Sequence, residues 1–226
     1  MTRPWETLEV VETAEGRLEL RRRGPDELLI TIGGRVLMNS RANRSELALG
    51  RLAAEAIAGR AAPRVLVGGL GMGCTLRACL DGLGPDAQVV VAELNPAVAA
   101  WCRRGPLAAL SGGAAGDPRV RVEIGDVAET IRGAARPGGA RFDAVVLDLY
   151  EGPGPRCRPD HPHFGREALA RTRAALRAGG VLAVWLEEPA PAFERSLARA
   201  GFRVRSERAG AGGRRHAVAL ATRGRP

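Results

Sequence analysis

The stretch Val65-Leu66-Val67-Gly68-Gly69-Leu70-Gly71-Met72-Gly73-Cys74 (VLVGGLGMGC) decides the fold class of this chain. Its apolar residues form a run that is typical of a buried strand, and four glycines then fall within six positions. The segment that follows, TLRACLDGL, has the pattern of a helix. A strand, a glycine-rich turn and a helix in this order predict a place where a ligand approaches the backbone.

Length and composition fit one α/β domain with a small appendage. The chain has 226 residues, 45% of them hydrophobic, which is enough to bury a single sizeable core. No apolar run reaches the roughly 18 to 20 residues that span a bilayer, and the N-terminal segment lacks the apolar stretch of a secretory signal. We therefore expect a cytoplasmic protein with no membrane partner.

The net charge of +9 makes nucleic-acid binding a hypothesis to weigh, because clustered cations bind phosphates. All 34 basic residues are arginines, however, and they are dispersed, with Arg21-Arg22-Arg23 as the longest run. Four Phe and one Tyr leave few rings to stack on bases. We attribute the arginines to coding bias and expect no nucleic-acid partner.

The cysteines and histidines do not predict a metal site. His161 and His163 lie two residues apart in a loop, and His216 is distant from both. The four cysteines lack the C-x-x-C spacing of a zinc site and suggest no disulfide framework, so we expect buried thiols for the first three; they are Cys74, Cys79, Cys102 and Cys157.

The chain divides into a short front piece and a main domain. Residues 7–38 alternate apolar and polar with glycine-containing turns, which predicts three or four antiparallel strands. A helix is expected over 44–60, capped by Asn43. We place the boundary between the N-terminal β region, 1–43, and the main domain, 44–226, at this point.

The main domain alternates strands and helices. Its apolar runs are nearly continuous, as in strands covered on both faces, and helices between them imply a doubly wound, mostly parallel sheet. The last two strands are joined by SERAGAGGRRH, which is too short for a crossover helix and predicts an antiparallel hairpin at the sheet edge. The expected strands are 64–68, 88–93, 119–124, 142–148, 180–186, 202–207 and 215–222, and the expected helices are 73–83, 95–104, 126–134, 164–177 and 190–200.

Carboxylates stand at the ends of three consecutive strands. Glu93 ends the second strand, where it can accept both hydroxyls of a ribose, and Asp126 follows the third, where it can accept from an adenine amino group. Asp148 ends the fourth strand and would lie over the reactive end of the ligand. Beside a glycine turn without the lysine of a P-loop, these carboxylates predict a site for a nucleoside with an uncharged linker.

The segment from about 64 to 185 resembles class I S-adenosylmethionine-dependent methyltransferases, and within them the spermidine synthase branch. The phrases that carry the resemblance are VLVGGLGMGCTLR, VVVAELNPAV, DPRVRVEIGDV, FDAVVLDLYEGPG and ALRAGGVLAVW. The resemblance implies a Rossmann-like methyltransferase fold, S-adenosylmethionine or its decarboxylated form as cofactor, and a homodimer. It implies cofactor contacts from Gly68, Gly69, Gly71, Gly73, Glu93, Leu94, Asp126, Val127 and Asp148.

The sequence departs from that branch at the acceptor side. Aminopropyltransferases have GGGDGG in the glycine turn, and Gly71 stands here in place of the Asp. Glu151 replaces the second Asp of their DSSDP-like motif, and the Gln and Tyr-His pair of their front helix have no clear counterpart. A diamine pocket needs several carboxylates, so these losses favour methyl transfer to a small-molecule acceptor over aminopropyl transfer, which is kept as the alternative.

Residues after the fourth strand are the candidates for catalysis. We expect Asp148, Tyr150 and Glu151 at the reacting groups, with the Pro-rich loop 155–165 as a lid. His161 or His163 is a candidate base. For Trp185, Glu187 and Glu188 two interpretations stay open, lining the pocket and capping the next helix. Two further hypotheses stay open, a non-catalytic module that binds an adenosyl ligand and an intramolecular cleavage of the cofactor that releases methylthioadenosine.

Overall fold

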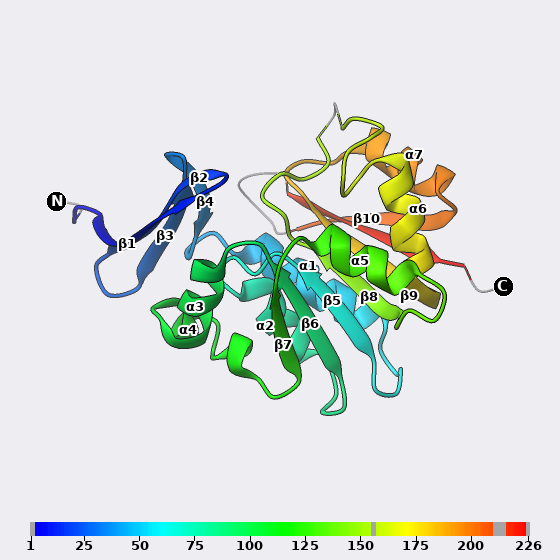
Figure 1. Cartoon of the computed structure of the whole chain (residues 1–226), viewed down its shortest axis with the longest axis horizontal. Helices are drawn as coiled ribbons and strands as arrows, with labels where there is room; N and C mark the ends of the chain where they lie inside the picture. The colour runs from blue at the N-terminus through cyan, green and yellow to red at the C-terminus, as the bar shows by residue number, and fades with distance from the viewer. Residues whose placement is uncertain (1–2, 155–156, 210–215, 225–226) are drawn as a thin grey trace.

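The computed structural model describes residues 3–154, 157–209 and 216–224, and within them the chain forms two sheets (Figure 1). The smaller sheet has four antiparallel strands in the order β1-β2-β3-β4. Its strands are β1 (Glu6–Thr13), β2 (Gly16–Arg23), β3 (Glu27–Ile32) and β4 (Arg35–Asn39). The antiparallel front piece is therefore confirmed, while the domain boundary after residue 43 stays a prediction.

The larger sheet has seven strands in the order β10-β11-β9-β8-β5-β6-β7. The central strands pair in parallel, and β11 pairs antiparallel with both β9 and β10, as the sequence predicts for an edge hairpin. The strands are β5 (Arg64–Gly68), β6 (Gln88–Glu93), β7 (Val120–Ile124), β8 (Phe142–Leu147), β9 (Leu176–Leu186), β10 (Phe202–Arg208) and β11 (Ala217–Arg223). Residues 210–215 of the predicted hairpin connection lie outside the described residues.

Helices cover both faces of this sheet. One core packs α1 (Arg44–Ala56), α2 (Cys74–Asp81) and α3 (Pro96–Arg104) on one face, and the other packs α5 (Val127–Ala135), α6 (Arg166–Ala175) and α7 (Pro191–Arg199) on the opposite face (Figure 1). Successive residues of β5 alternate between the two cores, with Val65 and Val67 in the first and Leu66 in the second. Both faces are buried, which explains the continuous apolar runs. The doubly wound fold class is confirmed.

The chain changes direction in the sheet between β5 and β8. It runs from β5 through β6 to β7, and then returns to place β8 on the other side of β5. Ligands of open α/β sheets bind at such a switch point, beyond the carboxyl ends of the strands. The turn after β5 and the residue after β8 therefore lie where a ligand is expected.

Some element boundaries differ from the sequence prediction. The helix expected over 164–177 ends at Ala175, and β9 begins at once at Leu176, with a register irregularity against β8. The helix expected over 44–60 ends at Ala56, before Gly59 adopts a positive φ of 78°. Two short helices were not predicted, because the segment around them is rich in glycine; they are α4 (Leu107–Leu110) and η1 (Ala114–Gly116).

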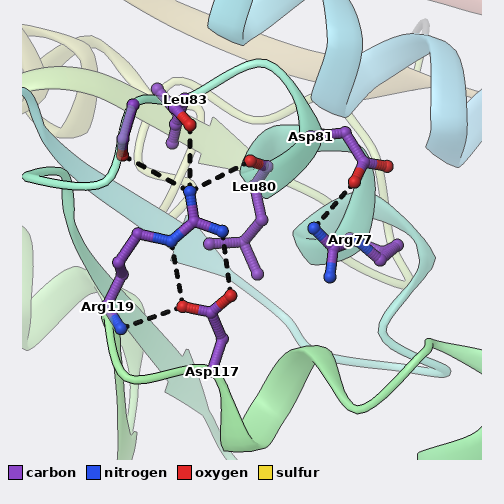
Figure 2. A network of polar contacts seen from close by, with 7 residues as sticks. Arg77, Leu80, Asp81, Leu83, Asp117 and Arg119 are labelled. Carbon is purple, nitrogen blue, oxygen red and sulfur yellow. Dashed lines mark hydrogen bonds and ion pairs between the residues drawn. The ribbon is translucent and has the colours of Figure 1, made fainter.

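The far end of α2 is held by an arginine from the start of β7. The Arg119 guanidinium donates to the carbonyl oxygens of Leu80 and Leu83 at 3.2 and 2.9 Å, and it pairs with the Asp117 carboxylate at 2.8 and 2.9 Å (Figure 2). The hydrogen bonds from Arg119 lower the pKa of Asp117 to about 2. Because helix carbonyls at this end lack intrahelical partners, Arg119 fixes α2 with its N-terminus at the glycine turn.

Among the described residues, no helix combines the length and apolar character that crossing a membrane requires. The same part of the chain holds no group of three His, Cys, Asp or Glu residues arranged to bind a metal ion. Three of the cysteines are buried as expected, Cys74, Cys79 and Cys102.

Candidate active site

The glycine turn lies between the ends of β6 and β8. The Gly69 N–H donates to the Ala92 carbonyl at 2.9 Å, and the Asp148 N–H donates to the Gly68 carbonyl at 2.9 Å. Gly69 has a φ of +84°, and a Cβ built on it would lie 2.3 Å from the Asp148 carbonyl oxygen. Only glycine satisfies both constraints, so the turn keeps bare backbone at the switch point.

Glu93 holds this turn from the side. One carboxylate oxygen accepts from the Leu70 N–H and the other from the Asn95 N–H, both at 2.8 Å, and the residue is 6% exposed. Burial raises the pKa of Glu93, and the N–H groups of Asn95 and Leu70 oppose that rise. A carboxylate has about four acceptor positions, so Glu93 retains capacity for the ribose hydroxyls that the sequence assigns to it.

Asp126 caps α5 and is more open. Its Oδ1 accepts from the Ala128 N–H at 2.8 Å and lies 3.0 Å from Nε2 of His163. Burial works to raise the pKa of Asp126, but the hydrogen bonds from His163 and Ala128 outweigh it, and the net pKa is lowered. Its side chain is 45% exposed, so an ionised acceptor remains available to a ligand.

Asp148 is the most perturbed carboxyl group of the site. It is half-buried, and the Thr75 hydroxyl lies 2.6 Å from its Oδ2. Burial and the charge of Glu46 raise the pKa of Asp148 to about 7, against the hydrogen bond from Thr75. Asp148 therefore takes up or releases a proton near neutral pH, and a neighbouring cation would favour its ionised form.

Glu46 was missed by the sequence analysis. It lies in the first turn of α1, its carboxylate accepts from the Ser45 hydroxyl at 2.6 Å, and the Thr75 hydroxyl lies 3.2 Å from its carbonyl oxygen. The Thr75 hydroxyl thus links α1 to Asp148. Acidic residues are common in the first turn of a helix, where they interact favourably with the helix macrodipole. The sequence alone therefore suggested only this structural role for Glu46.

The space beside Gly71 is filled by Met38 of β4. A Cβ on Gly71 would lie 2.2 Å from the Met38 sulfur, which also accepts from the Met72 N–H at 3.3 Å. An aspartate at position 71 would therefore displace the thioether. Met38 therefore occupies the space that the side chain of an aspartate at position 71 would need. The sequence did not reveal this packing.

The remaining predicted residues differ in exposure. Val127 is 3% exposed and packs on Gly68, so its side chain is part of the core, whereas Leu94 and Tyr150 are 51% and 45% exposed. Glu151 is also exposed. The structure brings Gly68, Gly69 and Asp148 into contact, and the roles assigned to these residues in cofactor binding and catalysis stay predictions.

The Pro-rich loop reaches the site at its far end. His163 contacts Asp126, so the structure places this candidate base at the expected adenine subsite. Residues 155–156 of the predicted lid lie outside the described residues, and a role as lid stays a prediction.

Together, the switch-point glycine turn, the carboxylates after consecutive strands and the antiparallel edge hairpin define a doubly wound, Rossmann-like fold with acceptor groups at its switch point. The family models give no match to the chain.

Comparison with known proteins then specifies the branch. The chain is 39% identical over 129 residues to the polyamine aminopropyltransferase of Mycobacterium tuberculosis strain H37Rv, a segment that covers 55% of this chain and 23% of that protein. It is 34% identical over 119 residues to polyamine aminopropyltransferase 1 of Hyperthermus butylicus, covering 53% of this chain and 39% of that protein. The match thus spans well under half the length of these relatives.

Solved structures agree on the fold. Spermidine synthase from Thermotoga maritima superposes with a TM-score of 0.73 at 18% identity, covering 97% of this chain and 74% of that one. A spermidine synthase in complex with the transition state analogue AdoDATO gives 0.72 at 19% identity, covering 97% and 73%. The chain has the spermidine synthase fold, and the resemblance to that branch is confirmed.

The preference for methyl transfer finds no support in these comparisons. The relatives are named aminopropyltransferases, which was the alternative reading. The preference rested on missing carboxylates, and it overlooked Glu46, whose charge acts on Asp148.

Proposed function

We propose that this chain transfers an aminopropyl group from decarboxylated S-adenosylmethionine to a small amine acceptor. The acceptor nitrogen forms a bond to the aminopropyl carbon, the carbon–sulfur bond breaks with its electron pair going to sulfur, and the nitrogen loses a proton. Methylthioadenosine is the second product. The sulfonium supplies the leaving group, so the chain must bind, orient and accept the proton.

The acidic environment of Asp148, which is buried and acted on by the charge of Glu46, supports this proposal, as do the relatives named aminopropyltransferases. Two carboxyl groups that repel one another near a ligand site are stabilised when an ammonium group binds beside them. A neutral acceptor would leave Asp148 partly protonated at pH 7, because its pKa is about 7. A cationic amine instead favours the ionised form, which can then accept hydrogen bonds and a proton.

Other residues at the carboxyl ends of the parallel strands would hold the aminopropyl donor. Glu93 would accept from the ribose hydroxyls, Asp126 from the adenine amino group, and the bare backbone of Gly69 would let the ligand approach the switch point. The fit rests on the acceptor capacity of the two carboxylates and on the absence of a side chain at Gly69, which lets the turn lie against the Asp148 carbonyl.

Product analysis tests the proposal. The protein is incubated with decarboxylated S-adenosylmethionine and, separately, with S-adenosylmethionine, each with a panel of aliphatic diamines, and the products are identified by mass spectrometry. We expect methylthioadenosine and an aminopropylated amine in equal amounts. S-adenosylhomocysteine with a methylated acceptor would replace the proposal by methyl transfer, methylthioadenosine without an acceptor would indicate intramolecular cleavage, and binding without turnover would indicate a non-catalytic module.

The pH dependence of turnover gives a second prediction. Because burial and, after it, the charge of Glu46 raise the pKa of Asp148 to about 7, kcat/KM for the acceptor should rise as pH increases through about 7, where Asp148 ionises. Glu46→Gln removes the like charge and should move this midpoint to lower pH. The measurement is the pH profile of kcat/KM for both proteins, in which titration of the acceptor itself is common to the two.

Glu55→Gln is the matched control for this profile. Glu55 lies in the last turn of α1, is exposed and pairs with Arg51 at 2.7 Å, so its removal should leave the midpoint unchanged. Equal shifts in the two variants would attribute the effect to the net charge of the protein and not to Glu46.

A further inference from the structure

We propose that His163 is a positioning residue for the adenine base, acting through Asp126. The inference rests on the proposed function, in which the adenosyl group of the donor binds at this edge of the sheet. His163 would hold the Asp126 carboxylate so that one oxygen stays fixed to the protein and the other faces the amino group of adenine.

The two carboxylate oxygens of Asp126 differ in their hydrogen bonds. The Ala128 N–H at 2.8 Å and Nε2 of His163 at 3.0 Å both lie at Oδ1. Within the described ranges of the chain, Oδ2 has no hydrogen-bond partner. A carboxylate held by two donors on one oxygen loses rotational freedom and presents the other oxygen in a defined direction.

The loop before α6 holds His163 in place. The Gly165 N–H donates to the His161 carbonyl and the Arg166 N–H to the Pro159 carbonyl, both at 2.9 Å. Nδ1 of His161 accepts from the backbone N–H groups of His163 and Phe164 at 3.2 and 3.3 Å. The backbone of His163 is thereby fixed at both ends of a tight turn.

An aromatic contact anchors the same turn to the core. The Phe164 ring is 3% exposed, stacks on the His161 ring with centroids 5.0 Å apart, and meets the edge of Phe193 of α7 at 5.6 Å. His163 itself is left with its side chain 21% exposed beside Asp126. The contact between them is therefore built into the packing of the loop against α6 and α7.

The charge at Asp126 suits an amino group. The net effect of His163, Ala128 and Arg132 is to hold the pKa of Asp126 below its usual value despite burial, so the carboxylate is ionised and only accepts hydrogen bonds at neutral pH. At ring position 6, adenine carries an amino group that donates to such an acceptor, whereas hypoxanthine carries a carbonyl oxygen, which the carboxylate repels. The chemistry at this edge predicts selection between the two bases.

Calorimetric binding of methylthioadenosine and methylthioinosine tests the inference. We expect the unmodified protein to prefer methylthioadenosine by on the order of 10 to 100-fold. His163→Leu occupies similar space without a hydrogen-bond donor. It should weaken the binding of methylthioadenosine about tenfold and the binding of methylthioinosine little, so that the preference for methylthioadenosine falls. His163→Gln keeps an N–H at a similar reach and should restore most of the preference.

Controls separate this role from a general one. Arg132→Ala removes a cation near Asp126 without removing a hydrogen bond to it, and should leave the preference nearly intact. His163→Ala serves as a second non-donating variant, and thermal unfolding reports whether each variant is folded.

The outcomes distinguish the role of His163 from the proposed function. Folded His163 variants with an unchanged preference, or with both nucleosides weakened equally, would overturn the role of His163 and leave the proposed function standing. If the unmodified protein binds neither nucleoside, the proposed function fails, and the inference fails with it.

Discussion

Replacing Asp148 with Asn is expected to lower kcat for aminopropyl transfer about 10³-fold, within the range found when a group that moves a proton is lost. The amide keeps the size of the side chain but neither accepts a proton nor carries the charge that favours an ammonium group. Donor affinity should fall less than tenfold, because Glu93, Asp126 and the glycine turn remain. Steady-state kinetics and calorimetric titration of the donor measure the two quantities separately.

Stability distinguishes lost catalysis from lost folding in this variant. The pKa of Asp148 is raised to about 7 in the folded protein from about 3.9 in an unfolded chain. The folded state binds the proton more tightly, so stability falls as pH rises between these values and ionised Asp148 is unfavourable above pH 7. Asp148→Asn removes that penalty, and its melting temperature at pH 8 should equal or exceed that of the unmodified protein. A variant that melts lower, or whose donor affinity falls more than its kcat, would make Asp148 a structural or a binding residue.

The strands of the sheet could be predicted from the sequence because their burial is visible in short, continuous apolar runs. Strands β5 and β6 have the predicted boundaries, since burial on both faces leaves apolar runs that end sharply at Gly68 and Glu93. The boundary at Leu176 could not be predicted in the same way. The helix ends there because the chain joins β8 in a distorted register, and such a pairing depends on residues distant in sequence.

The candidate site likewise contains residues that the sequence predicts and interactions that it does not. Residues directly after a strand were found, because parallel strands bring their carboxyl ends to one edge. Three interactions were missed because each joins segments far apart in the chain: the charge of Glu46 acting on Asp148, Met38 packed against Gly71, and His163 bonded to Asp126. A helix-start carboxylate, an apolar strand residue and a loop histidine carry no mark of such partners in the sequence. The preference for methyl transfer, which the comparisons do not support, followed from this, since the front helix was judged by its missing motif and not by the charge that it brings to the site.

The glycine turn should tolerate a methyl group very unevenly, with the largest loss of stability at Gly69. Gly69→Ala places a Cβ 2.3 Å from the Asp148 carbonyl oxygen at a φ of +84°. The carbonyl oxygen is a backbone atom at the end of a neighbouring strand, so relief requires β5 and β8 to separate and disturbs the hydrogen bond from Gly69 to Ala92. We expect a loss of more than about 3 kcal/mol in the free energy of unfolding, measured by urea denaturation.

The same substitution elsewhere isolates the cause. Gly133→Ala lies within α5 with no atom within 4 Å of the added Cβ, and should stabilise by about 0.5 to 1 kcal/mol. Gly71→Ala meets only the flexible side chain of Met38, so its loss should be intermediate and should shrink in a Met38→Ala background. Equal losses at Gly69 and Gly71 would show that positive φ alone sets the cost. The expected order instead assigns the two glycines different tasks: Gly69 lets two strand ends meet beside the ligand, whereas Gly71 makes room for a side chain that fills the place of a carboxylate.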